Sequence, residues 1–274
     1  MSTVPTITLD NGVEIPQLGL GVWQVENEVV PEVVTAALGS GYRHIDTAAV
    51  YGNEEGVGRA LAASELSRDE VFVTTKLWND DQGYDSTLKA FDASLDRLGL
   101  EFVDLYLIHW QSPKRNLYVE TWKAFEQLYA DKRVRAIGVS NFHIPALQRL
   151  FEETDLRPAV NQIELHPGLP QDELRAFNAE NDIVTQAWSP LAQGNILSSP
   201  VLADLAKKHG KSPAQVVLRW HLQLGNVVIP KSVTPARIAE NIDVFDFRLD
   251  NDDMAAIADL EDGQRTGGDP DKVG

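Results

Sequence analysis

Four polar side chains of this sequence could together carry out acid–base chemistry on a carbonyl group. They are Asp46, Tyr51, Lys76 and His109. A free tyrosine is a weak acid at neutral pH, with a pKa near about 10. A lysine ammonium beside Tyr51 would lower that pKa, and a carboxylate beside the lysine would keep the lysine charged. With a histidine to orient the bound carbonyl, the set is suited to protonating a carbonyl oxygen.

Each of the four residues also has an ordinary interpretation by itself. Asp46 could cap a helix that begins at Thr47, and Lys76 could be a solvated strand end. His109 could be a hydrogen-bonded core histidine, and Tyr51 could be a core or interface aromatic. The catalytic interpretation therefore depends on the elements that would bring the four together.

Short runs rich in β-branched residues, which are typical of strands, alternate with helical patterns about eight times. The runs cover residues 18–23, 43–46, 71–76, 103–109, 136–141, 159–162, 183–188 and 227–231. Between two of them, the spacing of Leu88, Phe91, Leu95 and Leu98 gives one apolar helical face. This alternation predicts a parallel sheet, either an open doubly wound sheet or a closed barrel. No Gly-x-Gly-x-x-Gly fingerprint follows the first strand, which favours a (β/α)8 TIM barrel.

One barrel domain is predicted to span residues 1–274, with two additions at its ends. Asn11-Gly12 between two alternating segments predicts an N-terminal β-hairpin that closes one end of the barrel. The tail from about residue 261 is rich in glycine and aspartate, and we expect it to be loose.

A barrel brings the carboxyl ends of its strands to one open face. Residues at these ends are Asp46, Lys76, His109, Ser140, Asn141, Gln162, Trp188 and Lys231. Tyr51 lies five residues after Asp46, in the loop that follows it. The predicted fold thus assembles the four candidate catalytic residues at one site.

Composition limits the possible partners. The chain carries 24 basic and 41 acidic side chains, a net charge of −17, which argues against nucleic-acid and anionic-membrane partners. There is no cysteine, which excludes disulfides, thiolate metal sites and a cysteine nucleophile. No apolar stretch is long enough for a transmembrane helix and no secretory signal is evident, so we expect a cytoplasmic protein. An anionic ligand would require a local basic island.

Three segments, in order, resemble the signatures of the aldo-keto reductases. Residues 41–58 resemble the first signature, residues 134–142 the second and residues 229–241 the third. The similarity extends to about residue 260, and it is greatest to the compact bacterial members that include the 2,5-diketo-D-gluconate reductases. This resemblance implies NADPH-dependent reduction of aldehydes, ketones or dicarbonyls to alcohols.

The resemblance also implies a role for each candidate catalytic residue. Tyr51 matches the proton donor, and Lys76 with Asp46 matches the pair that lowers its pKa. His109 matches the residue that orients the carbonyl. Trp23, Trp78 and Trp110 each follow a strand end and match aromatic residues that line the substrate pocket. Relatives often have proline where this chain has Gln111, so the loop that follows is expected to differ.

The family binds NADPH in an extended form, and three groups of residues match its contacts. Ser140, Asn141 and Gln162 match the side chains that hold the carboxamide, and Trp188 lies where the nicotinamide ring stacks. Leu191, Gln193 and Gly194 belong to a loop that folds over the pyrophosphate in relatives. The third group is Ile229, Lys231, Ser232, Val233, Arg237, Glu240 and Asn241.

Lys231 and Arg237 supply the expected basic island. A forked guanidinium and an ammonium would form a suitable clamp for the adenosine 2′-phosphate, while Glu240 and Asn241 match residues that contact the adenine. Without the other two motifs, this segment would be interpreted as an ordinary helix N-terminus with a solvated arginine.

Two other classes of protein remain as alternatives. A binding or structural protein could keep the barrel and the cofactor as a sensor. A barrel hydrolase could use a metal, although His-x-His and His-Glu-x-x-His spacings are absent, or a carboxylate pair such as Asp46 and Glu164. We rank the reductase first, without a metal and with a small-molecule carbonyl as its partner, and expect a monomer.

Overall fold

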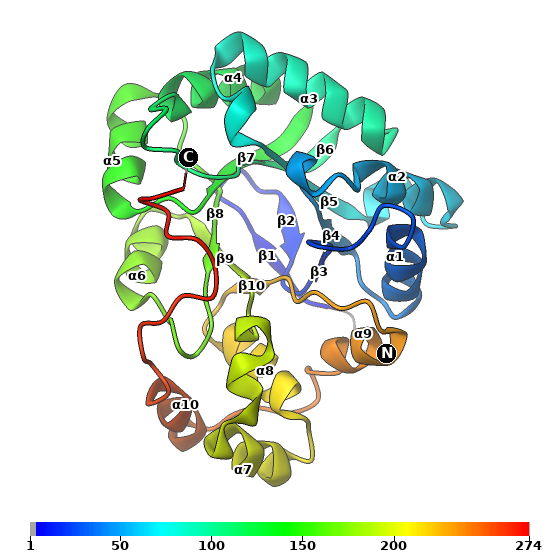
Figure 1. Cartoon of the computed structure of the whole chain (residues 1–274), viewed down its shortest axis with the longest axis vertical. Coiled ribbons are helices and arrows are strands. Elements are labelled where there is room, and N and C mark those ends of the chain that lie inside the picture. The colour runs from blue at the N-terminus through cyan, green and yellow to red at the C-terminus, as the bar shows by residue number, and fades with distance from the viewer. Residues whose placement is uncertain (1–3, 274) are drawn as a thin grey trace.

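Eight parallel strands surrounded by helices form the body of the protein (Figure 1). The structure is a computed structural model that describes residues 4–273. The strands are β3 (Leu20–Gly21), β4 (His44–Asp46), β5 (Phe72–Leu77), β6 (Val103–Ile108), β7 (Val134–Ser140), β8 (Val160–Glu164), β9 (Val184–Trp188) and β10 (Val227–Val228). Each pairs with its neighbours in chain order, as predicted for a (β/α)8 barrel.

The barrel closes between its first and last strands. Leu18 forms a parallel bridge with Val228. The backbone N–H of Gly19 donates to the carbonyl of Val228 at 2.9 Å, and that of Gly21 to Pro230 at 3.2 Å. The predicted closed barrel is therefore confirmed over the open sheet.

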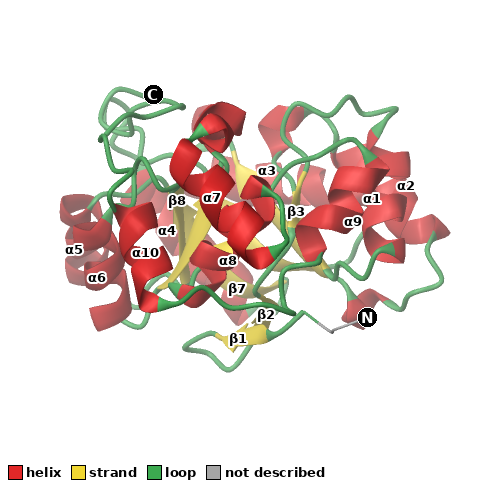
Figure 2. Cartoon of the chain, turned by 90° about the horizontal axis from the view of Figure 1, so that it is seen from below, coloured by secondary structure: helices red, strands yellow, loops and turns green. Residues whose placement is uncertain are grey.

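The predicted N-terminal hairpin is also present and lies at the amino-terminal end of the barrel. Strands β1 (Thr6–Thr8) and β2 (Glu14–Pro16) pair antiparallel. Leu9 and Ile15 are buried against residues near the starts of the barrel strands, among them Phe72 and Val160. Figure 2 shows this hairpin at the opposite end of the molecule from the C-terminus. It plugs the amino-terminal end and leaves the carboxyl ends of the strands open.

Helices surround the barrel. They are α1 (Val30–Gly39), α2 (Glu54–Ala63), α3 (Tyr84–Leu98), α4 (Tyr118–Ala130), α5 (Ile144–Glu153), α6 (Asp172–Glu180), α7 (Pro200–His209), α8 (Pro213–Gln223), α9 (Pro235–Ile242) and α10 (Asn251–Ala258). In residues 4–273, none of them is long and apolar enough to cross a membrane.

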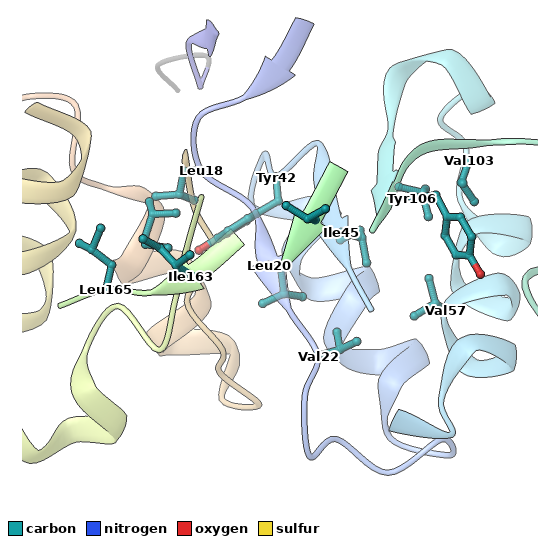
Figure 3. Packing of buried hydrophobic residues seen from close by; sticks show 14 of the residues in the cluster. Leu18, Leu20, Val22, Tyr42, Ile45, Val57, Val103, Tyr106, Ile163 and Leu165 are labelled. Atoms are coloured by element: carbon teal, nitrogen blue, oxygen red, sulfur yellow. The ribbon is translucent and has the colours of Figure 1, made fainter. Parts of the chain in front are cut away.

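Successive side chains of a strand point to opposite faces, so neighbouring residues of one strand lie in the hydrophobic core and in the polar site. Ile45 packs with Leu20 in the main hydrophobic core, where Figure 3 shows both side chains, while its neighbour Asp46 takes part in polar contacts with Lys76. Tyr106 stacks on Phe125 of α4, with ring centroids 4.5 Å apart. One face of each strand therefore anchors helices, and the other face supplies the barrel interior.

The C-terminal segment is not a free end. Residues 264–273 contain no helix or strand, yet Thr266 hydrogen-bonds to Glu164 and Gln111 hydrogen-bonds to Asp271. The segment that composition suggested would be loose is thus held against the barrel by specific contacts.

Candidate active site

Lys76 is the centre of the site at the carboxyl ends of the strands. Its ammonium donates to Oδ1 of Asp46 at 2.5 Å, to the carbonyl of Thr47 at 2.9 Å and to the hydroxyl of Tyr51 at 3.4 Å. The side chain of Lys76 is fully buried. Gln162 donates to the other oxygen of Asp46 at 2.7 Å. The barrel thus brings Asp46, Tyr51 and Lys76 together as predicted.

Burial and charge set the protonation states of the pair. Burial lowers the pKa of Lys76, but the Asp46 carboxylate and the Tyr51 hydroxyl more than offset this, so its pKa lies above the ordinary value. Lys76 is therefore an ammonium at neutral pH. Both oxygens of Asp46 have donors, which compensates this carboxylate for being buried.

The pKa of Tyr51 differs from the sequence-based expectation. Burial raises the pKa of the Tyr51 phenol above its ordinary value, and the charge of Lys76 opposes this rise without reversing it. The expectation of a pKa below the ordinary value is therefore wrong for this structure, because desolvation of the phenolate outweighs the ammonium. At neutral pH the phenol carries its proton, which is the form that a proton donor needs.

Tyr51 lies in the loop between β4 and α2, which buried hydrogen bonds hold in place. Asn53 is fully buried, accepts from the hydroxyl of Thr47 at 2.7 Å, and donates to the carbonyls of Val22 and Val25 at 2.9 Å. Because Asn53 ties this loop to the loop after β3, Tyr51 has little freedom to move. Asn53 lies within residues 41–58, the segment that resembles the first signature, and its residue type and spacing alone do not indicate this positioning role.

His109 follows β6 and faces Tyr51 edge-on, with ring centroids 5.7 Å apart. Burial, followed by the charge of Lys76, holds the pKa of His109 well below its ordinary value, so the imidazole is neutral. Its Nδ1 is buried with no hydrogen-bond partner among the described residues. Trp78 lies edge-on at 5.4 Å and Trp110 stacks at 6.3 Å. Two of the three predicted pocket tryptophans thus flank the histidine.

The predicted carboxamide residues form one network. Asn141, in the left-handed conformation with φ of 61°, donates to the carbonyl of His109 at 3.0 Å and to Oγ of Ser140 at 3.1 Å. Ser140 donates to the carbonyl of Gln162 at 2.8 Å. The indole of Trp188 donates to Oδ1 of Asn141 at 2.8 Å. These four residues lie beside the catalytic candidates, as the strand-end rule predicted.

A cleft of about 720 Å³ lies between the loop after β9 and the start of α9. Most predicted cofactor residues of these two segments line it: Leu191, Gln193, Gly194, Lys231, Ser232, Val233, Arg237, Glu240 and Asn241. Trp23, predicted for the substrate side, lines the same cleft. Ile229 is buried behind it, where its carbonyl would lie 3.0 Å from a Cβ placed on Gly21. The loop after β9 and the start of α9 thus line one cavity.

Lys231 and Arg237 are exposed at this cleft, and neither forms an ion pair with another side chain in residues 4–273. In a chain of net charge −17, two such cations in one cavity form the basic island that an anionic ligand requires.

The hydrolase alternatives gain no support. No group of three or more metal-binding side chains in residues 4–273 could hold a metal ion. The carboxylate of Asp46 accepts hydrogen bonds from Lys76 and Gln162. The carboxylate of Glu164 accepts hydrogen bonds from Thr266 and Gly267 of the C-terminal segment. Because both carboxylates are buried and already accept hydrogen bonds from the protein, they do not form a pair of acid and base groups that a substrate could reach.

Comparison with known proteins agrees with this geometry. The model of the "Aldo/keto reductase family" matches residues 17–262. An "Aldo-keto reductase" of Mycobacterium sp. (strain KMS) is 58% identical over 266 residues, 97% of this chain and 96% of the relative. "Methylglyoxal reductase DkgA" of Escherichia coli (strain K12) is 53% identical over 276 residues, all of both chains. A crystal structure of a mutant of Gox0644 in complex with NADPH is 48% identical, has a TM-score of 0.96, and covers 100% of each chain. The chain is therefore an oxidoreductase that belongs to the aldo/keto reductase family.

Proposed function

We propose that this protein reduces the carbonyl group of small aldehydes, ketones or dicarbonyls to an alcohol, with NADPH as reductant and Tyr51 as proton donor. The observation that carries the proposal is the ammonium of Lys76, which lies within hydrogen-bonding distance of both Asp46 and Tyr51. The methylglyoxal reductase among the relatives makes a small dicarbonyl the first substrate to test.

The residues of the cleft fit NADPH. Lys231 and Arg237 offer charges for the 2′-phosphate, while Leu191, Gln193 and Gly194 belong to a loop that lines the same cleft. Ser140, Asn141 and Gln162 offer polar atoms for a carboxamide, and Trp188 offers a flat face for the ring. NADPH would supply the hydride that the carbonyl carbon receives.

The side chains then have separate tasks. His109, neutral and beside Tyr51, hydrogen-bonds the carbonyl oxygen and orients it. Tyr51 gives its proton to this oxygen as negative charge develops on it. Lys76 stabilises the resulting phenolate, and Asp46 keeps Lys76 charged. Trp78 and Trp110 provide apolar walls beside His109.

The direct experiment is a spectrophotometric assay of NADPH consumption with purified protein and a panel that includes methylglyoxal, other dicarbonyls and simple aldehydes. Consumption that depends on the carbonyl, and that Tyr51→Phe abolishes, is the expected result. A protein that binds NADPH but consumes none with any carbonyl would support the sensor alternative instead. The proposal also includes a cytoplasmic monomer, which sedimentation equilibrium and fractionation would test.

A further inference from the structure

One buried carboxylate near the site has no part in the proposed mechanism. Glu164 ends β8 and is the register partner of Trp188 on β9. Its side chain is fully buried. The C-terminal segment meets it there: Oε1 accepts from the backbone N–H of Thr266 at 2.5 Å, from the Thr266 hydroxyl at 2.7 Å and from the N–H of Gly267 at 3.2 Å.

Glu164 is charged, which makes it a strong acceptor. Burial raises the pKa of its carboxyl, but hydrogen bonds from His166 and Thr266 more than compensate and bring the pKa below the ordinary value. His166 donates from Nε2 at 3.3 Å, and a guanidinium nitrogen of Arg265 lies 3.6 Å away. Hydrogen bonds to an ionised acceptor are about twice as strong as neutral ones, so the carboxylate is a firm anchor for the chain that meets it.

The anchored chain, residues 264–273, is called the strap below. Gly267 of the strap lies against the six-membered ring of Trp188, where an added Cβ would be 2.4 Å from Cη2. Gly268 approaches Trp110, where a Cβ would be 3.4 Å from Cη2. At its far end, Asp271 accepts from Gln111 at 2.9 Å and contacts His143 at 3.0 Å. The missing Cβ at Gly267 thus allows the strap backbone to lie directly against the Trp188 ring, while Gly268 lies within ordinary contact distance of Trp110.

Trp188 is consequently held from two sides. Its Nε1 is fixed by Asn141 at 2.8 Å, and the opposite end of the indole meets Gly267. The strap also reaches the loop after β9, because Gln193 donates to the carbonyl of Thr266 at 3.1 Å. Residue 266 therefore links a buried carboxylate of the barrel to the cofactor loop, and residue 267 links the same carboxylate to the proposed stacking ring.

We propose that Glu164 is a positioning residue, which fixes the strap on Trp188 and Trp110 and thereby sets the geometry of the cofactor ring and of the carbonyl pocket. This inference rests on the proposed function only in assuming that Trp188 contacts the cofactor ring and that Trp110 lines the carbonyl pocket. The anchoring of the strap by Glu164 does not depend on that function and can be measured without substrate or cofactor.

The first test is hydrogen exchange of the full-length protein. Glu164→Gln keeps the size of the side chain and removes its charge, and the exchange of the Thr266 and Gly267 amides is expected to accelerate about tenfold or more. Thr266→Val removes one donor, and Thr266→Ser keeps it as the matched control. An unchanged exchange rate of both amides in Glu164→Gln would overturn the anchor, whatever the enzyme does.

The second test separates positioning from stability. In Glu164→Gln and in Gly267→Ala, where the methyl group cannot fit beside Trp188, the KM for methylglyoxal and the Kd of NADPH from quenching of tryptophan fluorescence are expected to rise about tenfold. Thr266→Ser should match the wild type. Faster exchange with unchanged KM and Kd would mean that Glu164 only stabilises the fold, and would refute the positioning role. A wild-type protein that consumes no NADPH would refute the proposed function and leave the exchange result standing.

Discussion

The ammonium of Lys76 donates to the hydroxyl of Tyr51 across 3.4 Å. It is the longest of the three hydrogen bonds that this ammonium makes, since its contacts with Asp46 and Thr47 are 2.5 and 2.9 Å. The charge of Lys76 therefore opposes the rise in the pKa of Tyr51 that burial causes, but does not cancel it. The phenol remains protonated and is next to a cation that stabilises its conjugate base.

Replacing Tyr51 with phenylalanine keeps the ring beside His109 and removes the acid. A positioned general acid contributes about 10² to 10⁴-fold to a rate, so kcat for carbonyl reduction should fall by at least this lower amount while the Kd of NADPH changes little. Tyr84→Phe, at an exposed position, is the control. Reduction by Tyr51→Phe at a near-normal rate would remove Tyr51 from the mechanism.

Replacing Lys76 with methionine removes the charge that opposes the effect of burial on Tyr51. The pKa of Tyr51 should rise further, so the pH profile of alcohol oxidation with NADP, which requires the phenolate, should move to higher pH. The variant also leaves Asp46 buried without its cation, at a cost of about 3–5 kcal/mol in the free energy of unfolding. The double variant Lys76→Met with Asp46→Asn relieves this cost and should show a smaller displacement in the same direction, because the Asp46 carboxylate itself raises the pKa of Tyr51. A profile that does not move would contradict the role of Lys76.

Arg237→Ala tests the basic island. A hydrogen bond to a charged group is worth about 1.5–3 kcal/mol, so the Kd of NADPH should rise at least about tenfold while that of NADH, which has no 2′-phosphate, changes little. Arg157→Ala, an exposed arginine that does not line the cleft, is the control. Equal weakening of both nucleotides would exclude a contact between Arg237 and the 2′-phosphate.

Buried histidines make stability depend on pH. Burial lowers the pKa of His44 to about 4 and that of His221 to about 3. Because an unfolded histidine binds its proton near about pH 6.5, the unfolded state binds more protons below that value, and the free energy of unfolding falls as the pH falls. Each of these histidines should lower the free energy of unfolding by about 2 kcal/mol as the pH falls from about 6.5 to about 5. Urea titrations across this range measure the slope, and stability that is flat or rises on acidification would contradict the neutral buried imidazoles.

The amino-acid pattern predicts the architecture and most of the site residues. The alternation of strand and helical periods predicts a parallel sheet, and the missing Gly-x-Gly-x-x-Gly fingerprint favours a closed barrel over an open sheet. The strand-end rule then places Asp46, Lys76 and His109 together, because carboxyl ends of parallel strands share one face. Tyr51 follows Asp46 in the adjoining loop, and the resemblance in three motifs added the roles of these residues and the remaining cofactor residues. These inferences rest on local pattern and topology, which a single sequence carries.

The pKa of Tyr51 and the position of the C-terminal segment follow from the folded structure and not from the residue pattern. The direction of a pKa shift depends on the balance between desolvation and a charge a few ångströms away, and neither term is visible in the spacing of residues. The contact between Glu164 and Thr266 joins residues 102 positions apart. Composition alone predicted a loose end there, because glycine and aspartate content reports chain flexibility and not the buried carboxylate that the folded barrel presents to the chain.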